Sequence, residues 1–174
     1  MWREEDGIIY LSVTSDGTTG PDWIDRLERD ERFGQKGFGL CSDAEKLIGT
    51  MEFVSTTGVE MEIAILKGSR LVHGNRTLRQ VYEESFARQY ASLTVEAACL
   101  VRVAVTDEDI AAMGLQAVVV MHEPAYDQDH QFRYVIEVPR EKDDFILDVY
   151  PHYLDEEVSE DTGFAFLVPK ARSA

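Results

Sequence analysis

The sequence has few of the residues that mark secreted, membrane-spanning or nucleic-acid-binding proteins. Its 174 residues include 2 cysteines, 5 prolines and 17 basic residues against 33 acidic ones. The longest late apolar run, residues 117–121, is far shorter than the ~20 residues that span a bilayer. The first residues, MWREEDG, place acids where a signal peptide needs bases. We therefore expect no membrane association.

The two cysteines, Cys41 and Cys99, lie far apart and form neither a CxxC motif nor a dense framework. This spacing favours free thiols, and with the missing signal it predicts a cytoplasmic protein. Cys99 stands in an apolar stretch, where burial raises a thiol pKa and opposes thiolate reactivity.

The shortage of basic residues gives a formal net charge of -16. Residues 101–174 hold 16 acidic and 6 basic residues, so this part carries -10 of the total. Such a field repels polyanions, and we expect no nucleic-acid partner. The acidity suits solubility, or a cationic partner or metal. A hydrophobic content of 44% predicts a packed core. We expect one compact unit over 1–174, or two subdomains of about 1–92 and 93–174 that share a core.

Alternating and β-branched apolar residues predict the strands. Residues 8–13 form a β-branched run after Gly7, and residues 59–65 alternate apolar and polar side chains. Three valines in a row make residues 115–121 a strand buried on both faces. Further strands are predicted at residues 132–138, 145–150 and 164–168.

Capping residues predict the helices. Pro21 is placed for the first turn of a helix that runs to about Asp30, and a loop follows over residues 31–39. Capping-box pairs start two more helices, Ser42 with Glu45 and Thr77 with Gln80. Thr106 and the three acids after it start a short helix. Residues 95–105 fit both helical and strand spacing, and either structure is open.

The order of these elements predicts an α+β fold. Strands alternate with helices in the first half, and the second half is richer in strands, which favours a mixed, mostly antiparallel sheet with helices packed on one face. We expect a ferredoxin-like sandwich, used once or duplicated. A doubly wound parallel sheet is the alternative.

Two segments carry a resemblance. TDEDIAAMGLQAVVVMHEP at 106–124 and VTSDGTTGPDWIDRLE at 13–28 resemble small bacterial proteins known mainly as uncharacterised structural orphans. The resemblance implies a ferredoxin-like α+β fold and no particular activity.

One loop concentrates side chains that bind metals. Between two predicted strands, residues 122–130 hold two imidazoles and three carboxylates, which could ligate Zn, Mn or Fe and leave positions open for water. HExxH is absent, and the same residues also suit a solvated turn. The candidate ligands are His122, Glu123, Asp127, Asp129 and His130.

The strand-to-helix turn at residues 14–20 is a second candidate, because glycines and helix amides can hold a phosphate. It lacks the GxxxxGK[ST] and GxGxxG patterns, and a capped turn explains it as well. His73 and His152 are isolated and are expected on the surface or in loops.

No catalytic grouping stands out from these patterns. The leading hypothesis is a non-catalytic binding or regulatory module that acts through an exposed sheet face or by self-association, with a second copy or another protein as partner. The alternative is a metal-dependent enzyme that uses the loop at 122–130. Any cofactor stays unknown at this level.

Overall fold

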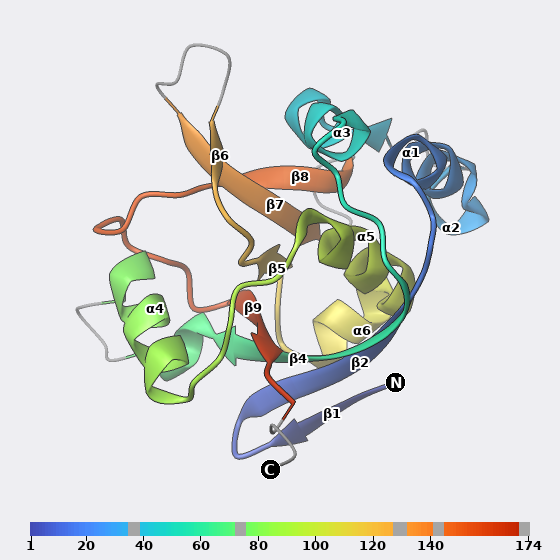
Figure 1. Ribbon diagram of the computed structural model, residues 1–174. Helices are drawn as coiled ribbons and strands as arrows, with labels where there is room; N and C mark the ends of the chain where they lie inside the picture. The colour runs from blue at the N-terminus through green and yellow to red at the C-terminus, as the bar shows by residue number, and fades with distance from the viewer. Residues whose placement is uncertain (35–38, 72–75, 127–131, 141–144, 171–174) are drawn as a thin grey trace.

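The computed structural model of the chain describes residues 1–34, 39–71, 76–126, 132–140 and 145–170. Over these residues the strands form one nine-stranded sheet, with helices packed against it (Figure 1). The strands are β1 (Trp2–Glu5), β2 (Ile8–Asp16), β3 (Gly39–Leu40), β4 (Thr57–Lys67), β5 (Ala117–Val120), β6 (Ala125–Tyr126), β7 (Arg133–Pro139), β8 (Phe145–Pro151) and β9 (Thr162–Val168). The helices are α1 (Gly20–Arg29), α2 (Glu31–Gly34), α3 (Ser42–Gly49), the 3-10 turn η1 (Gly68–Arg70), α4 (Leu78–Ala87), α5 (Val95–Ala104) and α6 (Asp107–Ala112).

The strand order is β1-β2-β4-β9-β5-β7-β8-β3, and β6 pairs with β7. Only the β5–β9 and β3–β8 pairs are parallel; the other pairs among the described strands are antiparallel. The α+β class with a mixed sheet is therefore confirmed. The two halves of the chain share one sheet: β4 of the first half lies beside β9 of the second, and β3 of the first half pairs with β8 at the far edge.

Helices cover both faces of the sheet, so the expectation of helices on one face is wrong. On the first face, side chains such as Ile9, Ile63 and Val118 pack with Trp23 and with residues of α5. The alternate side chains of the same strands point the other way and join α4 in a second cluster. That cluster includes Ala64, Leu66, Val119, Phe164 and Val81. Because the central strands are apolar on both sides, both faces need a cover.

Helix α5 resolves the ambiguity of residues 95–105. Every residue from Glu96 to Arg102 is buried, because α5 lies between the sheet and the outer helices α1 and α3. A helix that is buried all round has no polar stripe, so its apolar residues fit strand spacing as well as helical spacing. No described helix has the length and apolar content needed to cross a bilayer.

The predicted capping patterns are only partly correct. Thr106 and Asp109 form a complete capping box at α6, and the Thr77 hydroxyl accepts the Gln80 amide at 3.4 Å. The Gln80 side-chain oxygen has no hydrogen-bond partner among the described residues, so that box stays half formed. At α3 the cap is Cys41, whose Sγ accepts the Ala44 amide at 3.4 Å. The prediction of a Ser42 cap was wrong by one residue.

The expected loop over residues 31–39 was also wrong in part. Its first four residues form the short helix α2, and Phe33 from α2 is buried in the first core cluster. The last residue, Gly39, begins β3. Residues 35–38 lie outside the described part of the chain.

Candidate functional site

His122, the first predicted metal ligand, is buried directly after β5 and bonds through both ring nitrogens. Nε2 accepts the backbone N–H of Ile136 at 2.9 Å, so Nδ1 carries the proton and donates to the Glu123 carbonyl at 2.7 Å. Burial lowers the pKa of His122 to about 4. The neutral ring therefore ties the end of β5 to β7, and a metal at Nε2 would have to displace the Ile136 bond.

Of the other four predicted ligands, Glu123 alone lies within the described residues. Glu123 is exposed, and its side chain lines a pocket. Asp127, Asp129 and His130 lie outside the described residues. Within the ranges that the structure describes, no three His, Cys, Asp or Glu side chains are grouped as a metal site would require.

The strand-to-helix turn at residues 14–20 is held together by hydrogen bonds to the carboxylate of its own Asp16. The Asp16 carboxylate accepts the Thr18 amide at 3.1 Å and the Thr18 hydroxyl at 2.6 Å, and Arg26 donates to it at 2.7 Å. These contacts lower the pKa of Asp16 to about 2. Asp22 adds a second carboxylate in the first turn of α1. A phosphate would meet two anions here, so the capped-turn interpretation fits the geometry better.

The thiols are free and are made less acidic by burial. Burial raises the pKa of Cys41 to about 11 and raises that of the fully buried Cys99 further. The predicted direction for Cys99 is confirmed. At neutral pH both side chains are thiols, a form with little nucleophilicity.

His152 lies in the loop directly after β8, one of the two positions predicted for it, and it is buried there rather than on the surface. Its Nε2 lies 2.7 Å from the Tyr82 hydroxyl, and the two rings meet edge to face. Burial lowers the pKa of His152 and raises that of Tyr82 to about 12, so the pair is neutral near pH 7. The pair joins α4 to the segment after β8. His73 lies outside the described residues.

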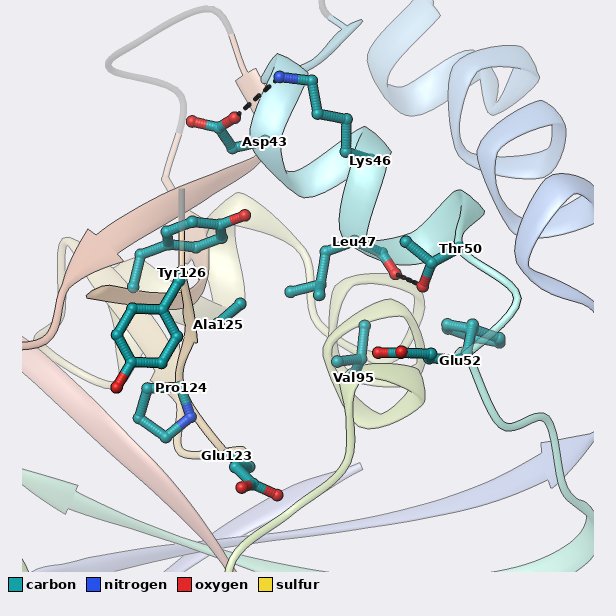
Figure 2. A pocket seen from close by; sticks show the side chains of 12 residues that line it. Asp43, Lys46, Leu47, Thr50, Glu52, Val95, Glu123, Pro124, Ala125 and Tyr126 are labelled. Carbon is teal, nitrogen blue, oxygen red and sulfur yellow. Dashed lines mark hydrogen bonds and ion pairs between the residues drawn. The ribbon is translucent and has the colours of Figure 1, made fainter. Parts of the chain in front are cut away.

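A pocket of about 700 Å³ lies between α3 and β6, with the first residue of α5 between them (Figure 2). Leu47 of α3, Val95 of α5 and Ala125 of β6 supply apolar lining, and Figure 2 shows the Leu47 side chain turned toward Ala125. The complete lining is Asp43, Lys46, Leu47, Thr50, Glu52, Phe53, Val95, Glu123, Pro124, Ala125, Tyr126 and Tyr134. The volume falls within the 300–1,000 Å³ range of small-molecule sites.

Charge in the pocket is unevenly paired. Lys46, the cation of the lining, lies 3.3 Å from the Asp43 carboxylate on the same turn of α3. Within the described parts of the chain, the carboxylates of Glu52 and Glu123 take part in no hydrogen bond or ion pair. Both residues are exposed. The pocket therefore combines an apolar interior with carboxylates that are open to a ligand.

The segment that carries Glu52 is anchored to α5 by a buried carboxylate. Glu96 accepts the Thr56 amide at 2.9 Å and the Thr56 hydroxyl at 2.6 Å. Glu96 is itself 2% exposed, in the first turn of α5. A carboxylate at this place also offsets the positive end of the helix dipole. One wall of the pocket is thus fixed to the core helix.

Sequence reasoning missed this pocket, apart from Glu123. Its residues come from four separate segments that the sheet order brings together, and none of them forms a local motif. The acidic character of residues 122–130 was the one usable signal, and it pointed to metal. Comparisons of the chain with protein-family models, with curated proteins and with solved structures found no significant match.

Proposed function

We propose that the chain is a non-catalytic binding module that takes a small molecule into the pocket between α3 and β6. The observation that carries the proposal is the pocket itself, with its apolar lining of Leu47, Val95 and Ala125. Two of its carboxylates, Glu52 and Glu123, have no ion-pair partner among the described residues. Small-molecule sites combine these features, an apolar concavity with a few polar groups that orient the ligand.

The architecture favours the pocket over an exposed sheet face as the binding surface. Apolar side chains on both faces of the central strands are buried in two core clusters. Among the described residues, the most exposed large apolar side chains after Met1 are Met51 and Val54 in the loop after α3 and Phe86 on α4, so none of these three lies on a central strand of the sheet. Single exposed apolar residues of this kind need no functional explanation.

A fragment screen by ligand-detected NMR tests the proposal. We expect several fragments to bind the wild type and to be displaced by one another, and the ¹⁵N-labelled chain to show shifts at the Leu47, Val95 and Ala125 amides. Ala125→Trp fills the pocket and should abolish binding. Ala87→Trp places the same side chain at an exposed position near the end of α4 and is the matched control. Fragments that bind Ala125→Trp as well as the wild type would refute the proposal.

A metal-dependent enzyme stays the alternative prediction, because three of its five expected ligands lie outside the described residues. Metal analysis of protein purified without chelator tests it directly. Stoichiometric Zn, Mn or Fe that is lost in His122→Gln would support it. Metal-free protein that also ignores added Zn and Mn would contradict it.

Several further predictions belong with the proposal. A ferredoxin-like relationship, duplication and the kinship with small bacterial proteins stay predictions. Cytoplasmic location, the absence of a nucleic-acid partner and self-association also stay predictions. Light scattering tests the last of these.

A further inference from the structure

We infer that the ligand of this pocket is a small organic cation, with an ammonium group on an apolar or aromatic body. The inference rests on the proposed function, since it names the class of ligand that the pocket takes. It follows from the charges, the apolar lining and the aromatic rings, taken in turn.

The lining of the pocket carries more negative than positive charge, which favours a cationic ligand. Three carboxylates line the pocket against one ammonium, and that ammonium already pairs with Asp43 at 3.3 Å. Glu52 and Glu123 stay without an ion-pair partner among the described residues. Figure 2 shows the Glu52 carboxylate beside Val95 and the Glu123 carboxylate on the side of Pro124, across the pocket. A cation between them would meet opposite charge from both walls.

The apolar lining sets the shape of the rest of the ligand. Leu47, Val95 and Ala125 belong to three different elements and lie between the two carboxylates and Asp43 (Figure 2). A ligand with its charge between the glutamates would therefore lay its body on hydrocarbon. Burial of that body favours binding because it removes apolar surface from water.

The aromatic rings add to the preference for positive charge. Tyr126 and Tyr134 both line the pocket. The guanidinium of Arg133 lies over the Tyr126 ring, with its carbon 5.2 Å from the ring centre. Arg133 therefore occupies this face of Tyr126, and the rings can contact a ligand only through the parts that line the pocket, where aromatic faces favour a cation over an anion.

An anion is disfavoured even though α5 begins at the pocket. A helix N-terminus attracts anions, but the Glu96 carboxylate already lies in the first turn of α5 and is bonded to Thr56. The net charge of -16 acts in the same direction, since it attracts cations to the surface and repels anions.

Three matched probes test the inference: 2-phenylethylamine, which is a cation, 2-phenylethanol, which is neutral, and 3-phenylpropionate, which is an anion. Affinities are measured by shift titration of the ¹⁵N-labelled chain. We expect the amine to bind at least about tenfold more tightly than the alcohol, and the anion to bind most weakly. The double variant Glu52→Gln with Glu123→Gln should reduce amine binding to the level of the alcohol and leave alcohol binding unchanged.

The control removes the same number of charges elsewhere. Glu28→Gln with Glu83→Gln lies on exposed parts of α1 and α4 and should leave the preference for the amine intact. An alcohol or anion that binds the pocket as tightly as the amine would overturn the inference while the proposed function stands. No amine binding at about 10 mM would also overturn the inference. The fragment screen tests the proposed function independently of this result. Tight binding of the peptide Lys-Phe-Lys without amine binding would replace the small cation by a basic peptide.

Discussion

The charged side chains near the two ends of helix α5 differ in burial and in pairing. Near the C-terminal end, Arg102 is 1% exposed and donates to the Pro139 carbonyl at 2.9 Å, the Val105 carbonyl at 3.3 Å and the Asp107 carboxylate at 3.0 Å. Its guanidinium also covers the Phe33 ring. Beside the N-terminal end, Glu52 and Glu123 line an open pocket without partners among the described residues. The first arrangement stabilises the fold, and the second is available to a ligand.

The largest loss of stability is expected at the C-terminal end of α5, where Arg102 is paired. Arg102→Ala removes the donor from two backbone carbonyls and leaves Asp107 uncompensated in a half-buried place, so we expect a loss of about 3–5 kcal/mol in the free energy of unfolding. Urea denaturation measures it. Arg29→Ala, which removes an exposed i,i+4 pair with Asp25, should cost about 0.5 kcal/mol or less. Equal losses in the two variants would remove the contrast between the ends of α5.

The next effect depends on pH and concerns His122. Its pKa falls from 6.5 to about 4 on folding because burial disfavours the charged ring. The unfolded chain therefore binds the extra proton more readily, and stability is lost as the pH falls from about 6.5 toward 4.

We expect the free energy of unfolding to drop by about 2 kcal/mol from this group between about pH 7 and pH 5. His152 acts in the same direction, so His122→Gln should remove only part of the slope. Denaturation of both proteins at the two pH values measures the difference. An unchanged slope in the variant would show that the buried ring does not titrate as described.

Glu96 shares a feature with each end of α5. Like Arg102 it is buried and hydrogen-bonded, and like Glu52 it belongs to the surroundings of the pocket, because its bonds to Thr56 hold one pocket wall. Glu96→Gln keeps one acceptor for Thr56 and loses the charge-assisted bond to the other, so we expect a loss of about 1–2 kcal/mol. Hydrogen exchange at the Thr56 amide should quicken. Glu45→Gln, at an exposed position of α3, is the control. Equal exchange rates of the Thr56 amide in the two variants would contradict the anchoring role of Glu96.

The smallest effect on stability is expected at the pocket. The double variant Glu52→Gln with Glu123→Gln should change the free energy of unfolding by no more than about 0.5 kcal/mol, since neither carboxylate has a described partner to lose. Thermal denaturation checks this result. A loss as large as that of Arg102→Ala would mean that these carboxylates support the fold.

Local patterns predicted most of the secondary structure. The β-branched run of β2, the alternation in β4 and the Thr106 cap of α6 each reflect forces that act within a few residues. The edge strand β1 was missed because three of its four residues, Trp2–Glu5, are charged and show no apolar pattern, although its backbone pairs with β2. The choice between helix and strand at residues 95–105 stayed open because α5 is buried on every side, so its sequence has no polar face that would mark a helix.

The arrangement of the sheet and the pocket could not be predicted in the same way. The apolar residues of the central strands were visible, but which helix covers which face depends on the crossing order β4-β9-β5. Likewise, Glu52 and Glu123 lie 71 positions apart, and no spacing rule connects them. Of the residues that line the pocket, only Glu123 was identified as a functional candidate, and it was identified as a metal ligand.

A crystal structure of the chain grown with 2-phenylethylamine tests the central claim most directly. The account predicts the ammonium between the Glu52 and Glu123 carboxylates and the phenyl ring against Leu47, Val95 and Ala125. An empty pocket at saturating amine, or amine bound only at another surface, would contradict it.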